Sequence, residues 1–172
     1  MPNWCENNLR VGGERKDLDA FLAECFSKNE YGRVFLDFEK IVPPPENYFR
    51  KNIGVQEIKY CKENGLIDWF TWNIGNWGTK WNVTECDIED NDSSITVWFE
   101  TAWSPPTPIM EALTKKYTSL SFTLEYSEGG VGYRGIYESQ NGETLQNDSW
   151  DMTREDMIEL GYLDEDEEEE TA

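Results

Sequence analysis

The chain has 172 residues, enough for one domain that buries roughly two thirds of its unfolded surface without a metal or disulfide staple. Aromatic residues make up 14% of it, which excludes a disordered protein, and no run of about 18 apolar residues is present to span a membrane. The net charge is −20, with 35 acidic residues, 15 basic residues and no histidine. This excess disfavours direct binding to the backbone of DNA or RNA.

The negative charge is concentrated toward the C-terminal end. Residues 138–172 hold 14 acids and one base, Arg154. The run Asp164–Glu170 repels itself, so we expect residues 163–172 to form a disordered acidic tail, whose simplest role is solubility. We expect residues 1–162 to form a single domain.

The first half of the chain predicts a strand, a helix and then an irregular block. Residues 6–11 read as a strand closed by two glycines, and residues 14–28 read as an amphipathic helix with apolar side chains at 3.6-residue spacing. Residues 29–80 interrupt this pattern and are interpreted as an insertion. Within it, a helix is expected at 55–64, ended by Gly65.

The second half predicts regular β structure around one helix. Residues 81–88 and 94–101 read as two strands joined by an Asp-Asn-Asp turn. A helix is expected at 108–117, with Thr107 as its N-cap and Pro108 at its first position. Glycine turns at 129–130 and 141–142 should then join strands at 119–126, 131–138 and about 143–149. A last helix is expected at 153–160, ended by Gly161.

Without the insertion, the element order is β-α-β-β-α-β followed by two further strands. That order is typical of the α+β, ferredoxin-like split βαβ arrangement. Its usual strand order is 4-1-3-2, and the extra strands should extend the edge beside strand 4. The sequence therefore predicts one antiparallel sheet of order 6-5-4-1-3-2, with helices on one face.

Four segments carry a family resemblance. They are "MPNWCENNL" at the start, "NWGTKW" at 76–81, "TAWSPP" at 101–106 and "YSEGG" at 126–130. In this order they resemble the signature segments of the YubB-type ferredoxin-like domain family of bacteriophages and conjugative plasmids. The resemblance covers residues 1 to about 135. It implies the same fold, a bacterial cytoplasm and a mobile-element origin, and it implies no activity or catalytic residues.

The residue types needed for common catalytic and metal sites are missing. There is no histidine to serve as a base, and no P-loop or dinucleotide fingerprint follows a strand. The four cysteines match no metal-binding spacing, and without an export signal they should stay free in a reducing cytosol. We expect no cofactor or metal. An enzyme that uses carboxylates alone remains open, because acidic residues are abundant.

The tryptophan-rich corner allows two readings. In the first, Trp77, Trp81 and Trp103 pack together between the insertion and the sheet. In the second, the corner binds a small molecule or nucleotide: Lys80 would hold an anionic group while the indoles stack on a flat one. The candidate ligand-binding residues of this second reading are Trp77, Lys80, Trp81, Trp103, Glu128 and Arg134.

The uncovered face of the predicted sheet is the other candidate surface. If residues such as Leu9 and Val97 face the helices, the opposite face carries Asn8, Arg10, Trp98, Glu100, Thr123 and Glu125. RNA-binding modules of this topology display several aromatic and basic residues there, so this set does not favour RNA binding.

The sequence favours a non-catalytic acidic interaction protein. Its partner would be a host protein or one encoded by the mobile element, and its carboxylates could imitate nucleic-acid phosphates to inhibit a nucleic-acid-handling or defence protein. The alternative is the small-molecule or nucleotide module at the tryptophan-rich corner.

Overall fold

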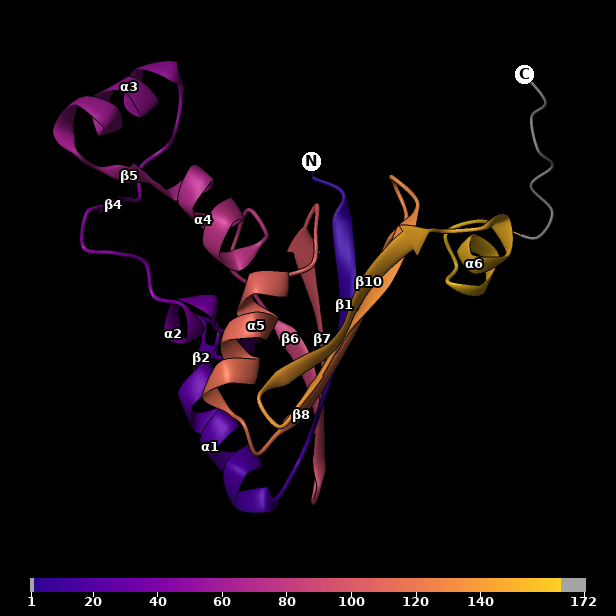
Figure 1. Cartoon of the computed structure of the whole chain (residues 1–172). Helices are drawn as coiled ribbons and strands as arrows, with labels where there is room; N and C mark the ends of the chain where they lie inside the picture. Colours follow the sequence, from indigo (N-terminus) through magenta and orange to yellow (C-terminus); the bar gives the residue numbers. More distant parts are fainter. Residues whose placement is uncertain (1, 165–172) are drawn as a thin grey trace, which may run out of the picture.

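The computed structural model describes residues 2–164, so residues 165–172 of the predicted tail lie outside the described part. One large antiparallel sheet forms the centre of the molecule (Figure 1), and its six strands run in the order β10-β9-β8-β1-β7-β6. Their bounds are Trp4–Gly12 (β1), Cys86–Asn91 (β6), Ser94–Ala102 (β7), Ser121–Glu128 (β8), Tyr133–Gln140 (β9) and Glu143–Asp151 (β10).

The predicted α+β class with a large antiparallel sheet is confirmed. Numbered by their own order along the chain, the strands of the large sheet read 6-5-4-1-3-2. The complete set of strands differs from the prediction, because the segment between α1 and the large sheet contains two further sheets of two strands each. These strands are Phe26–Lys28 (β2), Val34–Leu36 (β3), Tyr48–Phe49 (β4) and Ile67–Asp68 (β5).

Six helices accompany the described strands: Arg15–Cys25 (α1), Phe38–Ile41 (α2), Val55–Asn64 (α3), Trp69–Trp77 (α4), Thr107–Lys116 (α5) and Arg154–Glu159 (α6). In Figure 1, α1 and α5 lie on one side of the large sheet, whereas α6 lies on the other. Helix α1 is shorter than predicted, because residues 26–28 pair with β3. The predicted cap of α5 is also wrong, since Pro106 is the N-cap and Thr107 is already helical.

The tryptophan-rich stretch contains a helix that the sequence analysis missed. Helix α4 is capped by Asp68, whose carboxylate accepts a hydrogen bond from the backbone N–H of Thr71 at 2.8 Å. It ends at Gly78, which adopts a φ of 80° that a residue with a side chain rarely adopts. Helix α4 thereby turns the chain back toward the large sheet.

The strand predicted at 81–88 begins only at Cys86. The residues before it are held by side-chain contacts instead of strand pairing. The Asn82 amide oxygen accepts from the backbone N–H groups of Phe38 and Val83, and its Nδ2 donates to Asp37 Oδ1 at 2.8 Å. These bonds tie the segment to the start of α2, so Trp81 is not a strand residue.

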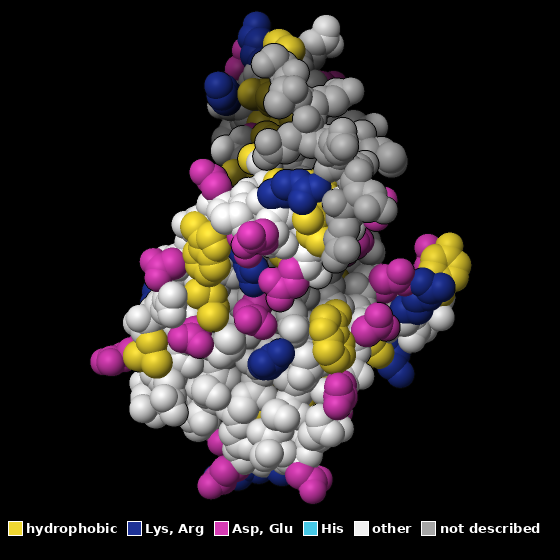
Figure 2. All heavy atoms as spheres, turned by 90° about the vertical axis from the view of Figure 1, so that its right-hand side faces the viewer, with side chains coloured by type: hydrophobic (Ala, Val, Ile, Leu, Met, Phe, Trp, Pro, Cys, Tyr) yellow, Lys and Arg dark blue, Asp and Glu magenta, His cyan; other side chains and the backbone are white. Residues whose placement is uncertain are grey.

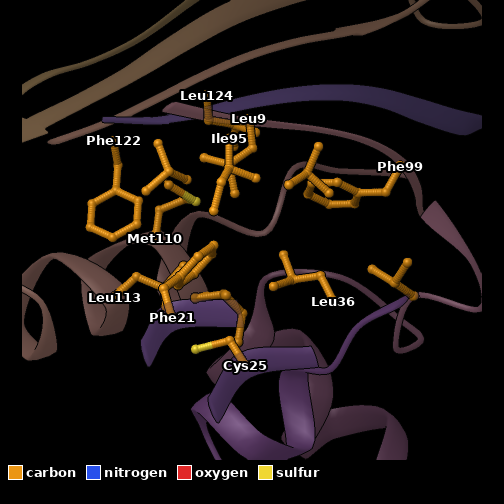
Figure 3. Packing of buried hydrophobic residues seen from close by; sticks show 14 of the residues in the cluster. Leu9, Phe21, Cys25, Leu36, Ile95, Phe99, Met110, Leu113, Phe122 and Leu124 are labelled. Atoms are coloured by element: carbon orange, nitrogen blue, oxygen red, sulfur yellow. The ribbon is translucent and has the colours of Figure 1, made fainter. Parts of the chain in front are cut away.

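The core lies between the sheet and the helices α1 and α5 (Figure 3). On the central strand β1, Cys5, Leu9 and Val11 are fully buried, and every second residue faces the other way. The inward-facing set predicted from the sequence is confirmed as buried: Leu9, Val11, Val97, Phe99, Phe122 and Leu124. Among the described residues, no helix is long and apolar enough to cross a membrane.

The predicted packed corner of three indoles is wrong, because only one of them is buried. Trp77 is 2% exposed, contacts the rings of Phe38 and Trp72 edge to face, and donates its indole N–H to the carbonyl of Val42. Trp81 and Trp103 remain 37% and 46% exposed. Of the three indoles, Trp77 alone therefore packs in the core, beside other insertion residues such as Leu36 and Phe38.

We expect Trp77→Ala to lower the free energy of unfolding by about 3–5 kcal/mol, because it leaves a cavity and an unpaired carbonyl. The matched control Trp103→Ala removes an exposed indole and should change it by less than about 1 kcal/mol. Urea denaturation of both variants measures the difference. Equal losses would show that Trp77 does not anchor the insertion.

All four cysteines are free, as predicted, and three of them are buried. Burial raises the pKa of each thiol, for Cys5 to about 12 and for Cys86 to about 11. Because the thiolate is the reactive form, these residues should be inert in the folded protein.

We expect iodoacetamide at pH 8 to modify the folded protein at least tenfold more slowly than the urea-unfolded protein, since unfolding returns the thiol pKa to roughly 8.5. Mass spectrometry over a time course checks this. Rapid labelling of Cys5 in the folded protein would contradict its burial.

Candidate functional site

The six candidate residues from the sequence do not form one site. Trp77 and Glu128 are buried, and the other four reach the surface. The Glu128 carboxylate accepts from the backbone N–H groups of Gly130 and Val131 at 2.7 and 2.9 Å. It holds the turn between β8 and β9, so its two oxygens are occupied within the protein.

Lys80 and Trp81 do come together. The Lys80 ammonium lies 4.4 Å from the centroid of the Trp81 ring, and that ring lies 6.2 Å from the ring of Trp4. Trp103 is not part of this cluster in any described contact. Its φ of 73° is unusual for a bulky residue, and its carbonyl accepts from the hydroxyl of Tyr133.

Arg134 lies on the open face of the large sheet, the face away from α1 and α5. Its guanidinium contacts Asp156 of α6 at 2.9 Å and lies 5.9 Å from the centroid of the Trp150 ring. Tyr162, which follows α6, shares a 2.9 Å hydrogen bond with Ser127 and packs against Gly129, where a Cβ would come within 2.3 Å of the ring. Helix α6 is thus fixed at one end of this face.

The open face is hollowed into a cleft of about 560 Å³. It is lined by acidic and aromatic side chains from five strands or their ends. Figure 2 looks onto this face and shows acidic groups gathered over its middle, with hydrophobic groups beside them. The charged and indole residues of the lining are Glu6, Glu85, Asp87, Trp98, Glu100, Glu125, Arg134 and Trp150.

Strand register aligns these residues in two adjacent rows across the sheet. The first row is Asp87, Trp98, Asn8, Glu125 and Ile136. The second row is Glu100, Glu6, Ser127, Arg134 and Trp150. Two glutamates, Glu6 and Glu100, therefore stand directly opposite each other on neighbouring strands, an arrangement that normally costs stability.

Only some of these carboxylates have a basic neighbour. Glu125 pairs loosely with Arg10 at 3.9 Å, and Glu85 pairs with Arg33. Glu6, Asp87 and Glu100 make no ion pair with any lysine or arginine of residues 2–164. The middle of the open face thus holds uncompensated negative charge on a rigid support.

These carboxylates do not gather into a metal site: among the described residues, no group of three or more potential ligands could hold an ion. The face suits larger cations spread over several carboxylates, such as ammonium and guanidinium groups. The sequence analysis placed Trp98, Glu100 and Glu125 on this face but missed Glu6, Asp87 and Trp150. Alternation along β1 could have identified Glu6, whereas the others required the true strand limits.

We expect Glu100→Gln to raise the free energy of unfolding by about 0.2–1 kcal/mol at low salt, because it removes one charge of an opposed pair. The gain should shrink in 1 M salt, which screens exposed charges. Thermal unfolding at both salt concentrations measures it, with Glu111→Gln on α5 as the control. A loss of stability at low salt would contradict the uncompensated pair.

Comparisons with known proteins concern the fold. Residues 80–172 match the family model described as "Ferredoxin-like domain in Api92-like protein". The crystal structure of protein Api92 from Yersinia pseudotuberculosis is similar, with a TM-score of 0.56 at 13% identity over 89% of this chain and 99% of that chain. No curated protein sequence matches.

The ferredoxin-like part of the resemblance read from the sequence is confirmed, and its narrower part, a YubB-type protein of phages and plasmids, stays a prediction. Because the matched region spans more than half of the 172 residues, the chain belongs to the family with the ferredoxin-like domain of Api92-like proteins.

Proposed function

We propose that this protein is a non-catalytic interaction protein of a bacteriophage or plasmid that acts in the bacterial cytoplasm. Its open sheet face would dock on a basic surface of a host protein that handles nucleic acid or serves in defence. The observation that carries the proposal is the set of carboxylates on this face that have no basic partner among residues 2–164, above all the opposed pair Glu6 and Glu100.

A rigid support is what makes charge mimicry effective. The carboxylates of the open face stand on neighbouring strands, which are spaced about 4.8 Å apart, and so they keep fixed positions relative to one another. A partner that holds phosphates with lysine and arginine presents a basic surface of complementary charge. Its docking would relieve the repulsion between Glu6 and Glu100, which supports a role for this pair in binding.

The same carboxylates have little support as catalysts. A carboxylate pair that works as acid and base needs two different environments, so that one group stays protonated. Glu6 and Glu100 are both exposed on the same face, in equivalent positions of paired strands. A recognition role requires only their charge and position.

The small-molecule alternative at the tryptophan-rich corner has less support. Trp77 and Glu128 are buried, and Trp103 and Arg134 have no described contact with Lys80. What remains for this alternative is the cluster of half-buried Lys80 with the exposed indoles of Trp81 and Trp4.

The test is competition with DNA for a defined basic probe. A labelled 20-base-pair duplex is bound to a peptide of alternating lysine and arginine, and the protein is added while fluorescence anisotropy is followed. We expect the protein to release the duplex at low salt, because its open face competes for the peptide. The variant Glu6→Gln, Asp87→Asn, Glu100→Gln, Glu125→Gln should require at least tenfold more protein.

The matched control removes the same number of charges elsewhere. Four exposed acids of the insertion and α5, Glu30, Glu46, Glu63 and Glu111, are changed to glutamine. This control variant should compete nearly as well as the unmodified protein. If both variants lose competition equally, only net charge matters and the proposal for the open face fails.

A further inference from the structure

Trp98 occupies the middle of the open face. It lies on β7, stands opposite Asp87 of β6 and Asn8 of β1, and lines the cleft. Its side chain is 41% exposed, and within residues 2–164 it makes no ring-to-ring or cation contact. A single exposed indole is ordinary on a protein surface. Trp98 differs because it lies in a cleft beside carboxylates that make no ion pair within the described part of the chain.

Two of those carboxylates are its immediate neighbours. Asp87 is the cross-strand partner of Trp98, and Glu100 is two residues along the same strand, so both share its face of the sheet. Neither has a basic partner among the described residues. The indole and the two carboxylates together offer a π face and acceptor oxygens to one cation.

Among the basic side chains, the guanidinium group fits this arrangement best. It is planar, stacks on indole rings, and donates from a rigid fork to carboxylates, whereas the ammonium of lysine is compact and strongly hydrated. The same cleft already contains such an arrangement within the chain. The Arg134 guanidinium lies 5.9 Å from the ring centroid of Trp150 and 2.9 Å from the carboxylate of Asp156.

We propose that Trp98, Asp87 and Glu100 form a binding site for an arginine side chain of the partner. The inference rests on the proposed function, because it concerns the same face, and it goes further by naming the chemistry of the docked surface. That surface presents arginine, which this position prefers to lysine. Arg134 packs between Trp150 and Asp156 at one end of the face, and Trp98 with its two carboxylates offers the same chemistry near the middle.

The experiment compares two peptides of nine residues, one of arginine and one of lysine, by calorimetry on the full chain. The arginine peptide should bind about threefold to tenfold more tightly, the usual strength of a cation–π contact with tryptophan. Trp98→Ala should bring the two affinities to within about twofold of each other. The control Trp103→Ala, which removes an indole of similar exposure outside the cleft, should leave the preference unchanged.

A second readout follows the indole N–H signals in a proton–nitrogen correlation spectrum. The signal lost in Trp98→Ala identifies Trp98, and that signal should shift with the arginine peptide more than the signal of Trp103. This readout reports contact at Trp98 itself, so it does not depend on whether a substitution changes the peptide affinity through another part of the protein.

The outcomes separate the two proposals. If neither peptide binds, the proposed function fails and the arginine site fails with it. A second outcome separates them. Both peptides bind the unmodified protein, and the variant Glu6→Gln, Asp87→Asn, Glu100→Gln, Glu125→Gln binds neither. If Trp98→Ala then keeps the full preference for arginine, only the arginine site is overturned.

Discussion

The position of β1 between β7 and β8 decides what the two faces of this protein carry. Because side chains alternate along a strand, the register that buries Leu9 also presents Glu6 and Asn8 on the opposite face. A slip of one residue would exchange the two sets and place carboxylates in the core. The register of β1 with β7 and β8 therefore determines both the apolar core and the acidic face.

The two faces are covered to different extents. Helices α1 and α5 bury the apolar side, and Trp77 fastens the end of α4 to the same core. On the other side, the contacts of Arg134 and Tyr162 fix α6 over one end of the sheet. The middle of the sheet stays open as a cleft, where Glu6, Asp87 and Glu100 have no basic partner among residues 2–164. The packed core offsets the repulsion between these carboxylates, so the sheet can hold them in the positions that a basic partner would contact.

Local signals allowed much of this fold to be predicted. The helix at residues 55–64 and the turns at 129–130 and 141–142 follow from spacing and glycine positions, and the element order indicated the α+β class. The shorter strand β6 could not be predicted in the same way, because Asn82 holds its preceding residues through contacts with Asp37, distant in sequence. The alternation of polar and apolar residues also predicted that Trp81 lies in a strand, but the contacts of Asn82 hold this segment outside the sheet.

The candidate site was predicted less well than the fold. Of the six residues proposed for it, only Lys80 and Trp81 come together, and burial separates Trp77 and Glu128 from the surface. The opposed pair of Glu6 and Glu100 depends on the register of strands more than 90 residues apart in the chain, a non-local property that no short pattern encodes.

Carbodiimide cross-linking of the protein to a lysine-containing basic peptide tests the central claim most directly, because it joins a peptide amine to the carboxylate that it contacts. Mass spectrometry should locate the cross-links on Glu6, Asp87, Glu100 and Glu125 of the open face. Cross-links found mainly on the acids of the insertion or of α5 would contradict the account, because the sheet face would then not be where the protein meets a basic partner.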